Sequence, residues 1–274
     1  MSRKMRRTLV SWALLSPLVV LTLFPFAVML ITALKPATEV LQPTWWPSRL
    51  AWENFATMWA ATGFGRALLN SLVVATLSTL LALAVAVPFA YAMDRLAFRG
   101  KGLLRQFLLV TQMLSPILLV IGLFRLVVAL GMVDRLSAVV VVYAAFGVAF
   151  TVWMLQAGFA AIPRELEEAA WLEGASRPRA LVTVFLPLAL PAIAVAGIFS
   201  FVSAWNEFVI ALTLLRQSES YTLPIQVFSL VAGRYTVEWH HVMAATLAAT
   251  LPVALVFAWL QGYLVRGLSV GAVK

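Results

Sequence analysis

Residues Leu69–Tyr91 read LNSLVVATLSTLLALAVAVPFAY, a run without a charged side chain. The run is longer than the ~20 apolar residues that an α-helix needs to cross a bilayer. Comparable runs lie elsewhere in the chain, at Val10–Leu34, Ala138–Gly158, Leu186–Leu214 and Val242–Val265, with a less regular one at Leu103–Leu123. The sequence therefore predicts an all-α integral membrane protein with six transmembrane helices. The outer end of the Leu103–Leu123 span is expected to dip back into the interface.

The composition supports this class. Of 274 residues, 63% are hydrophobic and 11% are charged, which excludes a soluble enzyme and a protein with a single membrane anchor. The chain has no cysteine, which excludes disulfides, a thiolate nucleophile and cysteine-ligated metal. Gly100-Lys101-Gly102 lacks the Ser or Thr of a phosphate-binding loop, and the adjacent His240 and His241 lack zinc-site spacing. We expect neither a cofactor nor a metal site in this chain.

The charged residues indicate the orientation in the membrane. With six spans, both termini lie on one side, and that side carries thirteen of the 20 Lys and Arg residues. The positive-inside rule places this side in the cytoplasm. The net charge of +9 thus reflects topology, and we expect no binding to nucleic acid. The first apolar run is too long for a cleavable signal peptide and is interpreted as a retained span.

The longest charged segment on the predicted cytoplasmic side lies at residues 163–187. Pro163 suits the first position of a short helix, and glutamates at 165, 167 and 168 favour the positive end of its dipole. Gly174 can end this helix in a left-handed conformation, and Ser176 can cap a second one. The segment is therefore predicted to form two short helices before the next span.

The first of these helices carries Ala169 and Ala170, whose small side chains would let another backbone approach closely. A short protruding helix of this kind fits a groove on a partner protein. It equally suits an amphipathic helix that lies on the lipid surface. The residues alone leave both interpretations open.

Glu207 is the one clear ionisable residue inside an apolar run, in Trp205-Asn206-Glu207-Phe208. A carboxylate at the centre of a membrane helix costs roughly 2.5 to 3.5 kcal/mol, so it must face protein, water or a partner. Asn206 and Glu207 either bond to neighbouring helices near the outer interface or line a translocation path. Both alternatives stay open.

Glu168-Ala169-Ala170, followed by Gly174, Val184 and Leu186-Pro187, resembles the EAA loop of bacterial ABC importer permeases. Valine at 184 replaces the usual isoleucine, and Glu173 replaces the commoner aspartate. Residues 162–167, 205–208 and 266–274 are similar to the carbohydrate-uptake branch, of the maltose type, whose importers depend on a binding protein. This resemblance covers nearly the full length of the chain.

The resemblance implies the type I ABC importer permease fold in one transmembrane domain over residues 1–274. It implies a cytoplasmic coupling loop at about 160–186 and a cytoplasmic tail at 266–274. The residues implied at the interface with an ATPase subunit are Glu168, Ala169, Ala170, Gly174, Leu186 and Pro187. Gly271 and Lys274 in the tail are possible further contacts.

The implied partners are a second homologous permease, a dimer of ATPase subunits, an extracytoplasmic substrate-binding protein and the lipid bilayer. ATP and magnesium would be bound by the ATPase subunits, so this chain would have no catalytic residue. The implied location is the bacterial inner membrane, where the chain would form half of a path for a sugar or sugar derivative.

Three alternatives remain. The same architecture could import glycerol 3-phosphate or a glycerophosphodiester. A self-sufficient, ion-coupled secondary transporter would move its substrate without ATPase partners. A structural subunit of a larger membrane complex would assemble through the same loop without transporting anything.

Overall fold

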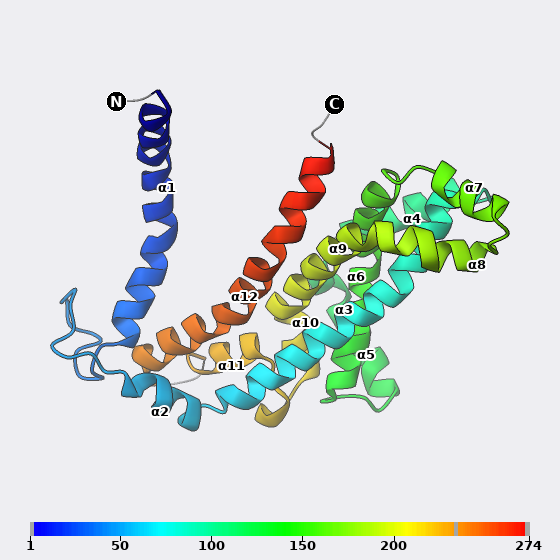
Figure 1. The fold of residues 1–274 in the computed structure, drawn as a ribbon. Helices are drawn as coiled ribbons and strands as arrows, with labels where there is room; N and C mark the ends of the chain where they lie inside the picture. The colour runs from blue at the N-terminus through cyan, green and yellow to red at the C-terminus, as the bar shows by residue number, and fades with distance from the viewer. Residues whose placement is uncertain (1–2, 233–234, 272–274) are drawn as a thin grey trace. The chain divides into compact units, whose positions relative to one another are not determined.

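The computed structural model is a set of α-helices (Figure 1), most of them joined by short segments, with a longer one at residues 34–52 between α1 and α2. It describes residues 3–232 and 235–271, and the side chains of residues 12–232 and 235–259. The helices are α1 (Arg3–Ala33), α2 (Glu53–Ala61), α3 (Phe64–Arg95), α4 (Lys101–Met113), α5 (Pro116–Ala129), α6 (Leu136–Phe159), α7 (Glu165–Leu172), α8 (Arg177–Ala180), α9 (Leu186–Asn206), α10 (Val209–Leu214), α11 (Leu223–Ser229) and α12 (Trp239–Gly271). A π-helical turn, Leu181–Phe185, joins α8 to α9, and a 3-10 turn, Ser218–Ser220, follows α10.

The chain forms two compact units. The first comprises Met1–Gly65 and Gln226–Leu251, and the second comprises Arg66–Ile225 and Pro252–Lys274. We describe each unit by itself. The single transmembrane domain expected from the sequence stays a prediction.

Five helical stretches in the described residues are long and apolar enough to cross a membrane: Trp12–Ala33, Phe64–Arg95, Leu136–Phe159, Arg177–Asn206 and Trp239–Trp259. The helix pair α4 and α5 makes a sixth if it counts as one span. The prediction of an all-α membrane protein with up to six spans is thus confirmed.

The predicted span Leu103–Leu123 is wrong as a continuous helix. Helix α4 ends at Met113, α5 begins at Pro116, and the two axes are bent by 96°. Leu114 and Ser115 are both extended, with ψ of 118° and 131°. Proline has no amide hydrogen and disfavours helical geometry in the residue before it, which accounts for the break at this position. The break lies in the middle of the run, whereas a dip was expected at its outer end.

The predicted span Leu186–Leu214 is wrong at both ends. It starts earlier, because the helix runs without interruption from Arg177 through the π-helical turn into α9. Pro187 has no amide hydrogen to donate, and the amide of Leu186 bonds the carbonyl of Leu181, five residues back. This π turn keeps the chain helical, where the sequence predicted a separate short helix before the span.

The same span ends earlier than predicted. Helix α9 stops at Asn206, and Glu207 is extended with φ −70° and ψ 130°. The last part of the apolar run forms the separate short helix α10. The run predicted as one crossing is therefore a long helix and a short one, with Glu207 at the break.

The first unit is organised around α2 and the segment that follows α1. The Asn54 side chain donates to the carbonyls of Ala33 and Lys35, both at 2.8 Å, which fixes α2 to the end of α1. His241 Nε2 lies 3.0 Å from the Thr57 hydroxyl oxygen, and His241 Nδ1 lies 2.8 Å from a Glu238 carboxylate oxygen. These bonds hold α2 against the start of α12.

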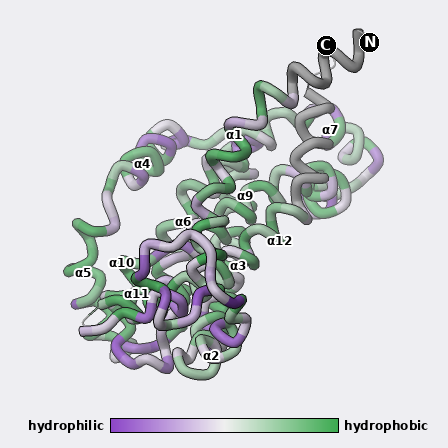
Figure 2. Tube along the Cα trace, turned by 90° about the vertical axis from the view of Figure 1, so that its left-hand side faces the viewer, coloured by the Kyte–Doolittle hydropathy of each residue, from purple (hydrophilic) through white to green (hydrophobic). Residues whose placement is uncertain are grey.

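The second unit is built on α3, α6 and α9, which pack through small residues. A methyl group added at Gly158 of α6 would lie 2.4 Å from the Ala192 Cβ of α9, so the two backbones approach closely there. One hydrophobic cluster includes Val139, Ile210 and Leu214, and another includes residues of α3, α6, α9 and the π-helical turn. Figure 2 shows α5 and α6 as mainly hydrophobic, whereas α4 also carries hydrophilic residues.

This close packing gives a testable prediction for Gly158→Ala. The added methyl group cannot fit without moving α6 from α9, and overpacking of this kind costs about 1–3 kcal/mol. We expect a lower midpoint of thermal unfolding for the detergent-purified protein.

Gly122→Ala is the matched control, since an added methyl group at this helical glycine meets nothing within 4 Å. Its midpoint should stay unchanged or rise. Equal midpoints for the two variants would contradict the close contact between α6 and α9.

Candidate functional site

The two helix breaks of the second unit open onto one cavity of about 320 Å³. Leu114 and Pro116 line it from the α4–α5 break, and Glu207 lines it from the end of α9. Non-helical backbone at membrane depth is tolerated where it lines a cavity or is buried in protein. Interrupted membrane helices also form the substrate sites of many transporters. These breaks make the cavity the candidate site for a passing substrate.

The lining of this cavity is rich in neutral hydrogen-bonding groups. Hydroxyl and amide side chains come from four helices: Ser78, Thr111, Gln112, Tyr143, Ser200 and Ser203. Phe146 and Phe150 add aromatic surface. Such a lining can bond the hydroxyl groups of a polar neutral molecule while its rings cover the apolar faces.

The Glu207 side chain forms hydrogen bonds with the backbone at the break between α9 and α10. Its carboxylate accepts the amide hydrogens of Ile210 at 2.9 Å and Ala211 at 3.2 Å, and so caps α10. Its carbonyl oxygen accepts the Tyr143 hydroxyl at 3.3 Å. Glu207 therefore bonds the start of α10 and lines the cavity, and its place in a translocation path stays a prediction. Asn206 is exposed, bonds the Val202 carbonyl of its own helix, and is not among the lining residues.

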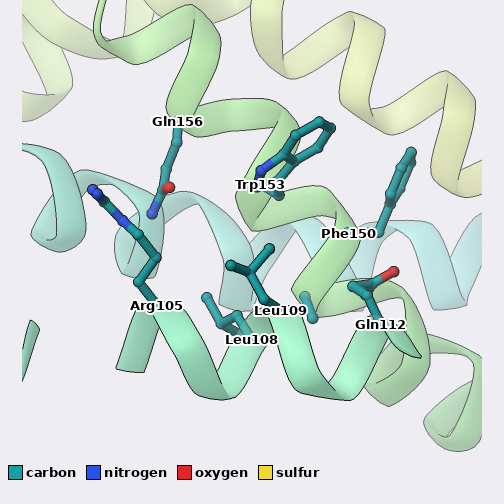
Figure 3. Close-up of a pocket in the computed structure, with 8 residues that line it drawn as sticks. Arg105, Leu108, Leu109, Gln112, Phe150, Trp153 and Gln156 are labelled. Carbon is teal, nitrogen blue, oxygen red and sulfur yellow. The ribbon is translucent and has the colours of Figure 1, made fainter. Parts of the chain in front are cut away.

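A second cavity of about 450 Å³ adjoins the first between α4 and α6 (Figure 3). The two cavities share Gln112 and Phe150 as lining residues. In Figure 3, Arg105 and Gln156 lie at the opposite end, and Trp153 projects from α6 between the ends. The Gln156 amide nitrogen is buried and has no hydrogen-bond partner among the described residues. The second cavity is therefore polar at its two ends and mainly apolar between them, where Leu108, Leu109 and Trp153 line it.

The loop that carries the predicted partner interface forms α7 and the turn after it. Glu168 and Ala169 are exposed on α7, as is Gly174 beyond its end. Gly174 has φ +90°, the left-handed conformation expected from the sequence, and the amide of Ala175 bonds the carbonyl of Ala170. Leu186 is half-buried and Pro187 is exposed at the start of α9.

Ala170 differs from its sequence expectation. It is 9% exposed, so α7 presents only Ala169 of the alanine pair to a partner. Leu166 and Leu172 are exposed to 43% and 91% and lie three residues to either side of Ala169. These three residues form an exposed apolar strip, and the exposed Glu165, four residues before Ala169, lies beside it on the same face of α7. The three-residue spacing of the strip could have revealed it in the sequence.

Sequence reasoning also missed the role of Glu167, which it treated as one of three acidic residues near the helix start. Glu167 is 2% exposed. Its carboxylate bonds Arg95 Nε at 2.6 Å and accepts the Tyr91 hydroxyl at 2.7 Å. Losing one partner of such a buried ion pair costs about 3–5 kcal/mol. Nothing local distinguishes Glu167 from its neighbours, because its partners lie more than 70 residues away.

The predicted tail contacts fall at the edge of the described chain. Gly271 is the last residue of α12, and Lys274 lies outside the described residues. Among the described residues, no group of three or more His, Asp and Glu side chains is placed to hold a metal ion.

Comparisons with known proteins bear on this arrangement. A family model described as "Binding-protein-dependent transport system inner membrane component" matches residues 86–270. The chain is similar to the diacetylchitobiose uptake system permease protein DasC of Streptomyces coelicolor, with 33% identity over 92% of this chain and 91% of DasC. It is also similar to the trehalose/maltose transport system permease protein MalG of Thermococcus litoralis, with 31% identity over 93% of this chain and 92% of MalG.

A solved structure has the same fold. It is the crystal structure of a bacterial ABC transporter involved in the import of the acidic polysaccharide alginate. The TM-score is 0.80 at 23% identity, and the match covers 96% of this chain and 98% of that chain. The stretch that the family model matches, residues 86–270, includes both helix breaks and the α7 loop.

The capping role of Glu207 can be tested by substitution. Glu207→Ala removes both acceptors from the start of α10 and should lower stability by about 0.5–2 kcal/mol. Glu207→Gln should lower stability by a smaller amount, since its side-chain amide oxygen still accepts a backbone amide hydrogen. The measurement is the midpoint of thermal unfolding in detergent.

Asn206→Ala is the control, because its side chain bonds only its own helix. It should change stability by no more than about 0.5 kcal/mol. The capping role is refuted if Glu207→Ala unfolds at the temperature of the unaltered protein.

Proposed function

Because this chain belongs to the family of binding-protein-dependent transport system inner membrane components, we propose that it is a permease subunit of an ATP-driven importer for a sugar or sugar derivative. The observation that carries the proposal is the hydroxyl-lined cavity where α4–α5 and α9–α10 break, within the stretch that the family model matches. In this proposal the cavity is part of the translocation path, and the chain catalyses no reaction.

The sugar substrate is supported by the names of the relatives and by the lining. DasC is named for diacetylchitobiose and MalG for trehalose and maltose. The cavity at the helix breaks is lined by neutral donors and acceptors with one carboxylate, and that carboxylate already caps α10. A phosphate group would need cationic partners there, and the described residues that line this cavity include no Lys or Arg; the one cation among those that line the adjoining cavity, Arg105, lies at its far end. These features favour a sugar over glycerol 3-phosphate.

The proposed partners follow from the family. A second permease would complete the path, two ATPase subunits would supply energy, and an extracytoplasmic binding protein would deliver the substrate. Both termini and α7 face the cytoplasm in this proposal, in agreement with the excess of Lys and Arg on that side.

In the same proposal α7 is the coupling helix, seated in a cleft of one ATPase subunit. The apolar strip of Leu166, Ala169 and Leu172 would enter the cleft, and exposed Glu168 would lie at its edge. Closure of the ATPase pair would then move α7 as a lever.

The coupling role predicts the effect of a large charged residue at the centre of this strip. Ala169→Arg should leave membrane insertion and the amount of protein unchanged, but it should abolish uptake, because the side chain blocks close approach. Ala169→Ser keeps a small side chain and should transport nearly normally. Uptake of labelled sugar by cells that express the whole transporter is the measurement, and normal uptake by Ala169→Arg would reject the coupling role.

The substrate class has a separate test. The soluble binding protein produced with this chain should gain thermal stability from a sugar and none from glycerol 3-phosphate, because bound ligand stabilises a folded protein by mass action. A gain from glycerol 3-phosphate alone would replace the sugar with the alternative substrate.

A further inference from the structure

We propose that Glu167 is a positioning residue that makes the coupling helix α7 move as one body with the adjoining end of α3. The inference rests on the proposed function of α7, and it adds the route by which motion of α7 enters the membrane helices. Three observations carry it: a buried charged cluster, its attachment to the α6–α7 connection at Ile162 and Arg164, and an open cavity beside it.

The cluster joins α7 to α3 through charged hydrogen bonds. Glu167 uses both carboxylate oxygens, one for Arg95 and one for Tyr91, which lie one turn apart on α3. The Arg95 and Glu167 side chains are 8% and 2% exposed. Charge-assisted bonds in such a dry site are strong and directional, so rotation or withdrawal of α7 would break both together.

Arg95 also holds the chain that leads into α7. Its Nη2 donates to the carbonyl of Ile162 at 2.7 Å, and its Nη1 lies 2.9 Å from an Asp94 carboxylate oxygen. From the other side, Arg164 Nη2 donates to the Asp94 carbonyl at 3.0 Å. The segment before α7 is therefore bound to the end of α3 by side chains of both segments.

An aromatic cluster backs the ion pair. The Phe185 ring, in the π-helical turn, packs edge-on against Tyr91 at 4.9 Å and Phe159 at 4.8 Å between ring centroids. The Arg95 guanidinium lies 5.1 Å from the centroid of the same ring. These aromatic rings exclude water from the Arg95–Glu167 pair. Through Phe159, they also connect the end of α6 to the cluster.

Beside this cluster, the space between α3 and the start of α8 is not filled by side chains. A cavity of about 840 Å³ lies there, lined among others by Leu96, Phe98, Trp171 and Arg177. Broad apolar packing thus does not join the end of α7 to the segment after α3. The Glu167 cluster supplies the rigid connection, so a push on α7 is transmitted to α3 through these few bonds.

The test uses the complete transporter, reconstituted in vesicles with its partner permease, ATPase subunits and binding protein. Glu167→Gln keeps the size of the side chain but removes the charge that pairs with Arg95. We expect ATP hydrolysis to persist while sugar moved per ATP falls about fivefold or more, the lower range of coupling between sites. Glu219→Gln is the matched control, an exposed glutamate in the 3-10 turn outside α7, and the amount of sugar that it moves per ATP should stay normal.

A second readout follows the geometry itself. The chain has no native cysteine, so spin labels can be placed at Ala97 and Trp171, which are both exposed. Trp171 is two residues from Ala169 and therefore lies on the other side of α7 from the face proposed to enter the ATPase subunit. In otherwise unaltered transporter, the distance between the labels should be the same with and without bound ATP. In Glu167→Gln the distribution of distances between the labels should broaden, and it should change when ATP binds, because α7 then moves without α3.

The outcomes separate the two proposals. Normal sugar per ATP and an unchanged label distance in Glu167→Gln overturn the positioning role. If the unaltered transporter hydrolyses ATP but moves no sugar, the proposed function fails, whereas the label distances still report on the cluster. Should Glu167→Gln fail to assemble, Tyr91→Phe removes one of the two bonds, and an unchanged ratio and distance in that variant also overturn the proposal.

Discussion

A membrane offers no water to bond exposed backbone groups, and the rest of this structure depends on that constraint. Long helices satisfy this constraint because their backbone groups bond to one another. This helical bonding is interrupted at two places in the second unit, after Met113 and after Asn206. At the second break, the Glu207 carboxylate accepts two amide hydrogens that α10 cannot satisfy internally. The acidic residue that looked costly in the apolar run is what makes that break tolerable.

The same constraint explains why the breaks and the polar lining occur together. Backbone released from helical bonding must face protein or a polar cavity, and both breaks face the cavity that Ser200 and Ser203 line from α9. A site for a hydroxyl-rich substrate needs the same groups. The requirement of the fold and the requirement of the proposed transport activity are therefore met by one set of side chains.

The charged residues at the α7 end of the second unit differ from one another in burial and in bonding. Exposed glutamates of α7 are available to a partner, whereas Glu167 is buried and bonded to two residues of α3. Neighbouring residues of one helix thus divide into an exposed side and an anchored polar side. In the proposed coupling role, this division would let a short helix act as a lever on the membrane helices.

Much of the architecture could be predicted from hydropathy, because a span of the membrane requires a long apolar run. The left-handed Gly174 was also predictable, since a turn after a short helix selects glycine. The break at Pro116 and the π turn before Pro187 were not placed, because a proline can end, bend or be absorbed by a helix depending on its surroundings.

The sequence by itself determined the class of the protein, its helical runs and the loop that resembles a coupling segment, because each depends on residues close together in the chain. Only the tertiary structure decided which side chains of that loop are buried and where the runs break. Ala170 and Glu167 are buried by elements far away in the sequence, and the cavity lining comes from α3, α4, α6 and α9 together. Burial depends on what packs against a residue, and no local pattern records that.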